Sequence, residues 1–211
     1  LLDFELEMGF FVGGPPNALG APVSMAEAED RIFGFVLCND WSARDIQKWE
    51  YVPLGPFGAK NFCTTISPWV VMAEALAPFR CPTSAGAQTD PAPLAYLADP
   101  QYSSFDVALD VAITPKGGET PTVVSRSNYR HMYWTAPQQL VHHSVTGCDM
   151  RPADLLASGG GSWRRVVGLC HRLRHAARRP PPLGWGTHAR RAPRRPARPA
   201  ARASPPPSAT A

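Results

Sequence analysis

The distribution of charge along this chain of 211 residues limits which part of it can fold. Residues 1–158 contain all 17 acidic residues and 9 of the 21 lysines and arginines, whereas residues 159–211 contain 12 arginines, no lysine and no acid. The two segments therefore carry net charges of −8 and +12. A segment dominated by Arg, Pro and Ala has too little apolar surface to form a core. We expect one folded domain over residues 1–158 and a disordered basic tail over residues 159–211.

The origin of the basic tail has two explanations. Runs of Arg, Pro and Ala without lysine are what a GC-rich gene yields when it is read out of frame, and we favour this origin. The alternative is an arm that binds nucleic acid or an acidic membrane, because 12 guanidinium groups attract phosphate in a salt-sensitive manner. The favoured explanation predicts no specific nucleic-acid partner and no membrane partner.

Acidic and apolar residues alternate near the start of the chain, from Leu2 to Phe11. This period is typical of a strand with one polar face, on which Asp3, Glu5 and Glu7 would line up. Side chains two residues apart on a strand lie roughly 6.5 to 7 Å apart, so two glutamates can converge on one ion. Asp40, which ends an apolar run, offers another carboxylate. Oxygen ligands favour calcium or magnesium; the alternative is a charged edge strand that prevents aggregation.

A short polar helix is predicted after Asn39. Ser42 is a suitable N-cap, so the helix should begin near Ala43, and Pro53 should end it around Tyr51 after about two turns. Arg44, Gln47, Lys48 and Tyr51 then share one face at helical spacing. Such a face suits a polar, oxygen-rich ligand, although an ordinary solvated helix face has the same composition.

The remaining residues favour a cytoplasmic protein without further metal sites. No stretch of the sequence is long and apolar enough to span a membrane, and no signal peptide is recognisable. The five cysteines lack metal-ligand spacing, so we expect reduced thiols. His131, His142 and His143 are expected to pack and to form hydrogen bonds rather than to act as bases.

Residues 82–100 read as a surface loop, and residues 127–145 as a helix interrupted by Pro137.

Five sequence segments together resemble the fumarylacetoacetate hydrolase family. NDxSARDxQ, which begins at Asn39, is typical of the whole superfamily, and its continuation WEYVPLGPF narrows the resemblance to the branch that hydrolyses 4-fumarylacetoacetate. The other segments are ELE from Glu5, TTISPWVV from Thr64, YWTAPQQLVHHSVTGC from Tyr133 and RPADLLASG from Arg151. The resemblance is nearly continuous from residue 1 to about residue 159.

The resemblance implies a fold, an assembly and a reaction. The fold is mainly β with short helices (α+β), an incomplete mixed β-sandwich roll of the family's C-terminal type, and the assembly is a homodimer. The substrate is a small diketo acid, 4-fumarylacetoacetate, whose carbon–carbon bond is hydrolysed to give fumarate and acetoacetate. This is the last step of tyrosine and phenylalanine catabolism.

The resemblance also implies roles for individual residues. Glu5, Glu7 and Asp40 match the family's calcium ligands, while Asp40, Lys60 and Thr64 match a magnesium site. Gln47 and Tyr51 match substrate-binding positions, and Arg44, Gln47 and Lys60 match the group that stabilises the oxyanion.

The departures from the family pattern predict that the chain as written is inactive. The family's catalytic His base and its Glu partner have no counterpart in this sequence, and FGAK before and including Lys60 replaces Phe-Leu-Gly-Lys. Loss of a positioned base costs roughly a hundred- to ten-thousand-fold in rate. Three readings therefore stay open: a fumarylacetoacetate hydrolase with an incomplete gene model, another diketone or acylpyruvate hydrolase of the superfamily, and a non-catalytic remnant or dimer-forming module.

Overall fold

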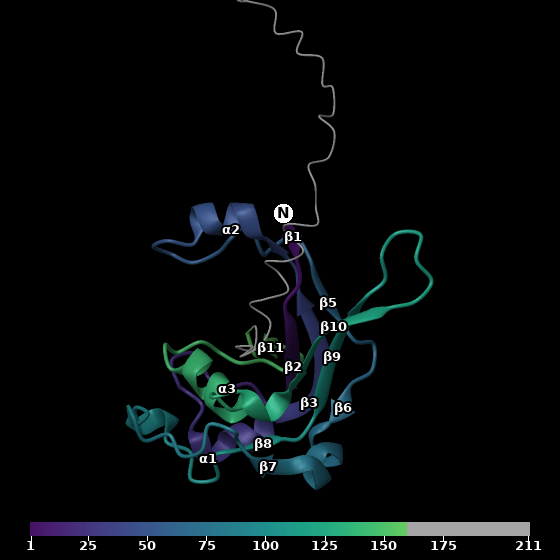
Figure 1. Cartoon of the computed structure of the whole chain (residues 1–211). Helices are drawn as coiled ribbons and strands as arrows, with labels where there is room; N and C mark the ends of the chain where they lie inside the picture. Colours follow the sequence, from purple (N-terminus) through teal and green to yellow (C-terminus); the bar gives the residue numbers. More distant parts are fainter. Residues whose placement is uncertain (160–211) are drawn as a thin grey trace, which may run out of the picture.

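A computed structural model describes residues 1–159 of the chain (Figure 1). The disordered tail predicted for residues 159–211 lies outside the described residues, except for Gly159. Within residues 1–159 the chain is mainly β with short helices, which confirms the expected fold class.

A curled antiparallel sheet forms the centre of the molecule. Its longest strands are β2 (Leu6–Val12) and β3 (Ile32–Asp40), which pair with Phe10 opposite Phe35 and Glu7 opposite Cys38. Strand β11 pairs with β2, and both β5 and β6 pair with β3; their bounds are Leu155–Ala157, Thr64–Ile66 and Val71–Met72. The apolar runs LEMGFFV and IFGFVLC thus become adjacent, largely buried strands, as their composition favours.

Three further antiparallel pairs lie outside this sheet. Strand β1 pairs with β4, β7 with β8, and β9 with β10; in chain order they span Leu2–Asp3, Ser42–Ala43, Arg80–Pro82, Ser103–Phe105, Ala108–Ile113 and Thr122–Asn128. The β1–β4 pair places the beginning of the chain beside the segment that follows β3.

The helices are short. They comprise α1 (Met25–Ala28), α2 (Arg44–Glu50) and α3 (Ala136–Ser144), and four 3-10 helices: η1 (Glu29–Arg31), η2 (Ala73–Phe79), η3 (Ala95–Leu97) and η4 (Tyr129–His131). Pro137 does not interrupt α3, because it lies in the first turn, where its missing N–H costs no hydrogen bond. Among residues 1–159, no helix is long and apolar enough to cross a membrane.

The core joins the sheet to the helices. Phe10, Phe35 and Leu140 are almost completely buried, and the Phe35 ring meets that of Phe105 edge-on at 5.5 Å between centroids. The predicted surface loop over residues 82–100 is mostly exposed, but it contributes the buried Leu97.

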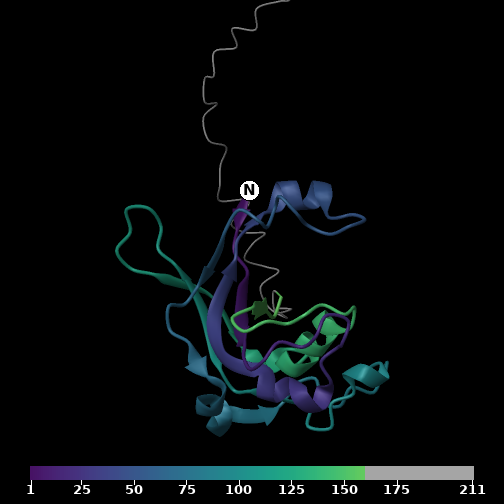
Figure 2. The ribbon, with the colours of Figure 1, turned by 180° about the vertical axis from the view of Figure 1, so that it is seen from behind.

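The arrangement of the elements separates two regions of the molecule. Helix α2 and strand β1 lie together at one end of β2 and β3, whereas α1 and α3 lie near the other end, and views from both sides agree (Figures 1 and 2). The polar residues of α2 are therefore placed next to the end of β3, where Asp40 lies.

Candidate metal and active site

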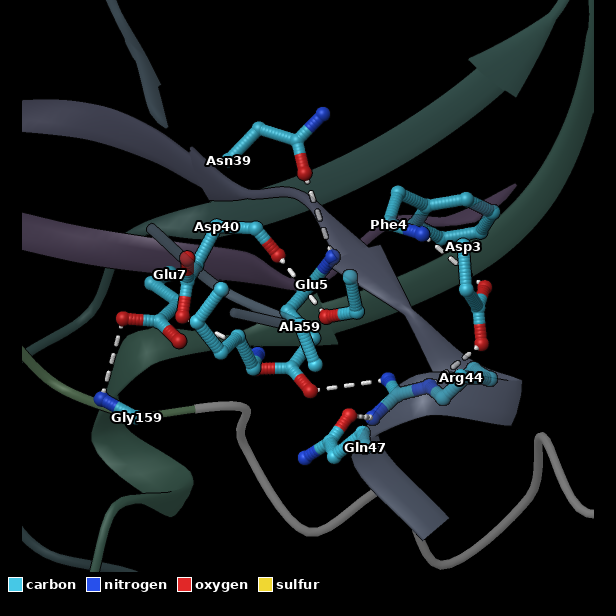
Figure 3. Close-up of polar contacts among 12 residues, drawn as sticks. Asp3, Phe4, Glu5, Glu7, Asn39, Asp40, Arg44, Gln47, Ala59 and Gly159 are labelled. Carbon is cyan, nitrogen blue, oxygen red and sulfur yellow. Dashed lines mark hydrogen bonds and ion pairs between the residues drawn. The ribbon is translucent and has the colours of Figure 1, made fainter. Parts of the chain in front are cut away.

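Three carboxylates meet where β2 and β3 lie side by side. Glu7 lies in β2, Asp40 ends β3, and Glu5 lies between β1 and β2. One oxygen from each of the three lies within 4.8 Å of the others (Figure 3). The predicted convergence of Glu5, Glu7 and Asp40 is therefore present among the described residues.

Asp3 does not join this carboxylate cluster. The strand predicted from Leu2 to Phe11 is broken at Phe4 and Glu5, so the expected row of three acidic side chains is wrong. Strand β1 pairs with β4 instead of continuing along β3, and Asp3 Oδ2 accepts a hydrogen bond from Arg44 Nε at 2.8 Å. The break is held by Asn39 Oδ1, which accepts the Glu5 N–H at 3.1 Å.

Two cations neutralise Glu5. Lys60 Nζ lies 2.6 Å from Glu5 Oε2 and 3.0 Å from Asp40 Oδ2, and Arg44 Nη2 lies 2.8 Å from Glu5 Oε1. Burial by itself would raise the pKa of Glu5, but Lys60 and Arg44 outweigh it and hold this pKa below its usual value. Glu5 is therefore ionised at neutral pH.

Glu7 has the opposite environment. Only 4% of the residue is exposed, and its Oε2 accepts a hydrogen bond from the Gly159 N–H at 3.1 Å. Burial, together with the negative charge of Asp40, raises the pKa of Glu7 to about 7. Glu7 thus lacks a cation of its own, and a divalent ion at this cluster would stabilise its charged form.

The donor set fits a hard divalent cation. Carboxylate oxygens favour calcium or magnesium, whereas zinc prefers nitrogen and sulfur ligands. Thr64 lies directly opposite Asp40 in the β3–β5 register, which puts it at the same end of the sheet. The ammonium of Lys60 already contacts two of the carboxylates, so a bound ion would have to share Glu5 and Asp40 with it.

Helix α2 forms where predicted but begins differently, and Lys48 of its predicted polar face is exposed. Arg44 Nη1 donates to Gln47 Oε1 at 2.8 Å, which joins two of the predicted residues (Figure 3). Tyr51 is the C-cap residue, and half of its surface is exposed. Ser42 is not the N-cap: it is fully buried in β4 and donates to the Asp40 carbonyl at 3.2 Å. The N-cap is Ala43, without a side-chain cap.

The segment before Lys60 does not depend on the shifted glycine. In Phe57 to Lys60, the Lys60 N–H donates to the Phe57 carbonyl at 3.0 Å. Gly55, not Gly58, adopts a left-handed conformation, with φ of 94°. The pair Gly58-Ala59 in place of Leu-Gly is therefore compatible with the observed position of Lys60.

Two contacts that support the site were not predicted from the sequence. Asp3 binds Arg44, and Glu50 Oε1 accepts the N–H groups of Phe57 and Ala59 at 2.7 and 2.8 Å. An acid at the end of a helix and before a segment rich in Gly and Pro is the only hint that Glu50 has such a role.

Two of the three described histidines, His131 and His142, have structural partners as predicted, whereas His143 is exposed. His131 Nδ1 lies 2.8 Å from Ser84 Oγ, and His142 Nδ1 lies 2.9 Å from the Tyr96 hydroxyl, with stacked rings. None of the histidines in residues 1–159 belongs to the carboxylate cluster. The four described cysteines carry free thiols.

Two cavities of the described residues lie away from the carboxylate cluster. A cavity of about 770 Å³ lies over Phe35, Phe105 and Tyr129, and one of about 590 Å³ lies between α3 and β11. Neither is lined by Glu5, Glu7 or Asp40. The convergence of charged groups, rather than cavity size, identifies the candidate site.

Comparisons with known proteins agree on one family. The family model described as fumarylacetoacetate (FAA) hydrolase C-terminal matches residues 1–179. The chain is 58% identical to the fumarylacetoacetase of Bos taurus over 159 residues, and 57% and 56% identical to those of Caenorhabditis elegans and Homo sapiens over the same length. Each alignment covers 75% of this chain and 37% of the relative, so the chain spans little more than a third of these relatives.

A solved structure supports the fold alone. The structure described as Cg1458 has a TM-score of 0.53 and 17% identity, and the alignment covers 77% of this chain and 50% of that one.

Proposed function

This chain belongs to the fumarylacetoacetate hydrolase family, and we propose that its site serves the metal-dependent hydrolysis of 4-fumarylacetoacetate to fumarate and acetoacetate. The reaction breaks a carbon–carbon bond next to a ketone, and it would complete tyrosine and phenylalanine catabolism. The printed names of the relatives support this substrate over other diketo acids.

One observation carries the proposal. A cluster of three carboxylates and a group of donors, namely Arg44, Gln47 and Lys60, meet at one end of β3. Carboxylates that bind an ion and donors that face an oxyanion are two of the groups that hydrolysis of a 1,3-dicarbonyl uses, beside a base for water.

The carboxylate cluster would hold the ion. Glu5, Glu7 and Asp40 would bind calcium or magnesium, with Lys60 and Thr64 beside a magnesium ion. When bound, a divalent ion acts as a Lewis acid on the carbonyl oxygens of the substrate.

The donors would act on charge that develops during the reaction. When water adds to the ketone, negative charge forms on the former carbonyl oxygen. The guanidinium of Arg44, the amide of Gln47 and the ammonium of Lys60 would stabilise that charge, each worth roughly a hundred- to a thousand-fold in rate. Gln47 and Tyr51 would also contact the substrate.

Further properties follow as proposals from the family. We propose a homodimer in the cytoplasm, with residues 1–158 as the catalytic domain and with neither nucleic acid nor membrane as a specific partner. We also expect the 211-residue chain alone to hydrolyse slowly or not at all, because no described histidine joins the carboxylate cluster to take a proton from water.

A grafting experiment tests the function. Residues 1–159 replace the matching segment of Bos taurus fumarylacetoacetase, and the loss of 4-fumarylacetoacetate is followed with and without calcium or magnesium. We expect turnover that depends on the ion and falls roughly a hundred- to a thousand-fold in Arg44→Ala.

The control for this experiment is Arg126→Ala. Arg126 is an exposed arginine of β10 that pairs with Asp110, so its removal should leave turnover unchanged. A grafted enzyme that folds and binds metal but does not hydrolyse this substrate would favour a non-catalytic role or a different diketo acid. Undiminished turnover in Arg44→Ala would contradict the proposed role of Arg44.

A further inference from the structure

The segment that joins α2 to Lys60 has little apolar packing. Residues 51–59 read YVPLGPFGA, and the side chains of Val52, Leu54 and Phe57 are all more than half exposed. Burial of these side chains therefore does not fix the path of the segment. Lys60 nevertheless follows it directly and points its ammonium at Glu5 and Asp40.

A single carboxylate holds the end of this segment. Glu50 Oε1 accepts the Phe57 N–H at 2.7 Å and the Ala59 N–H at 2.8 Å. The second oxygen, Oε2, lies close to Gly58: a Cβ atom added to Gly58 would be 3.6 Å from it. The hydrogen bond from the Ala59 N–H has the largest effect on the pKa of Glu50, followed by that from Phe57, and both lower it. The Glu50 carboxylate is therefore charged at neutral pH.

Ala59 transmits this constraint to the site. It is fully buried, and its carbonyl accepts the N–H of Ala43, the residue before Arg44, at 2.9 Å. Its N–H is one of the two that donate to Glu50. The residue before Lys60 is therefore fixed on one side by Glu50 and on the other by the backbone that leads into α2.

We propose that Glu50 is a positioning residue that places Lys60 against Glu5 and Asp40 through the backbone of Phe57 and Ala59. The consequence for catalysis rests on the proposed function, in which Lys60 stabilises the oxyanion. The placement of Lys60 by Glu50 does not depend on any activity. A carboxylate suits this task because two hydrogen bonds to one charged oxygen are stronger than two to a neutral amide.

The first test measures the hydrogen bonds in the 211-residue chain by NMR. In the unmodified protein, the amide proton shifts of Phe57 and Ala59 should titrate together with the Glu50 carboxylate. In Glu50→Gln this titration should disappear while the two amides stay protected from exchange. In Glu50→Ala, both amides should exchange about tenfold faster or more. Glu119→Ala, at an exposed acid of the β9–β10 loop, is the matched control and should change neither amide.

The second test reports on Lys60. Acetylation of Lys60 is compared with that of the exposed Lys116 in the same sample, and the ratio should rise several-fold in Glu50→Ala but much less in Glu50→Gln. In the grafted enzyme, Glu50→Ala should lower kcat at least tenfold with a smaller change in KM, and Glu50→Gln should recover most of it.

The outcomes separate this inference from the proposed function. Unchanged exchange at Ala59 in Glu50→Ala, or amide shifts in the unmodified protein that do not follow a carboxylate titration, would overturn the proposal whatever the activity. Faster exchange and labelling with unchanged turnover would support the positioning of Lys60 and would count against its role in catalysis.

Discussion

Glu5 and Glu7 are two residues apart and have the same side chain, yet their pKa values move in opposite directions. Lys60 and Arg44 surround Glu5 and lower its pKa, whereas Glu7 is buried beside Asp40 and its pKa rises to about 7. The positions of Lys60 and Arg44, rather than the residue type, therefore decide the charge of each glutamate.

Glu7 should make the metal-free protein less stable as the pH rises. Its unfolded pKa is near 4.5 and its folded pKa near 7, so between these values the folded chain binds more protons than the unfolded chain. The contribution of Glu7 is fully present below about pH 4.5 and lost by about pH 7, at a cost of roughly 2 kcal/mol after solvent screening. Urea unfolding at pH 5 and pH 8 checks this, and Glu7→Gln should remove that part of the difference. An identical pH dependence in Glu7→Gln would contradict the raised pKa.

Calcium affinity should rise with pH, whereas the stability of the metal-free protein should fall. Because the ion replaces the proton on Glu7, affinity should increase between pH 6 and pH 8 and binding should release protons. Calorimetric titration of the 211-residue chain in two buffers of different ionisation enthalpy measures both. The double variant Glu5→Gln with Glu7→Gln should give no binding heat. Equal heats from this variant and the unmodified protein would remove the metal site from consideration.

At the scale of elements, the caps of the helices differ in strength. Thr135 begins α3 with a complete capping box: its Oγ1 accepts the Gln138 N–H at 3.3 Å, and Gln138 Oε1 accepts the Thr135 N–H at 3.1 Å. Both residues are buried, and α3 carries the almost completely buried Leu140. In contrast, α2 begins at Arg44 after the N-cap Ala43, which provides no side-chain cap, and the helix is placed by its surroundings.

Removing the cap of α3 should destabilise the fold. Thr135→Ala leaves a buried N–H without its acceptor and should cost about 1 to 2 kcal/mol, while Thr135→Ser should retain most of the stability. Ser24→Ala, at the exposed cap of the four-residue α1, is the control and should cost less. Chemical denaturation measures all three. An effect of Ser24→Ala as large as that of Thr135→Ala would show that burial of the cap does not matter.

At the scale of the whole molecule, one hydrophobic core joins the central sheet of residues 1–159 to the elements around it. Phe35 joins the central sheet to β8 and η4 through contacts with Phe105 and Tyr129. The described segment ends in contact with the sheet, because Ser158 N donates to the Met8 carbonyl at 3.0 Å and Gly159 N donates to Glu7. A boundary after Gly159 therefore keeps both contacts.

A chain cut after Gly159 should unfold as the 211-residue chain does. We expect equal free energies of unfolding and equal denaturant slopes for the two, since the described residues form a hydrophobic core of their own. Phe35→Ala should lower the free energy of unfolding of each chain by roughly 3 to 5 kcal/mol. A smaller denaturant slope for the cut chain would mean that residues beyond Gly159 take part in the folded domain, against the proposed division.

Features that depend on local periodicity and composition could be predicted from the residues alone. These are the polar face that joins Arg44 to Gln47, the apolar strand that ends at Asp40, and the family to which the chain belongs. The tertiary structure decided which groups meet. Asp3 pairs with Arg44, and Glu50 fixes the turn before Lys60. The physical reason is that side-chain period fixes which face a residue occupies, whereas pairing between distant segments, such as β1 with β4, fixes what that face contacts.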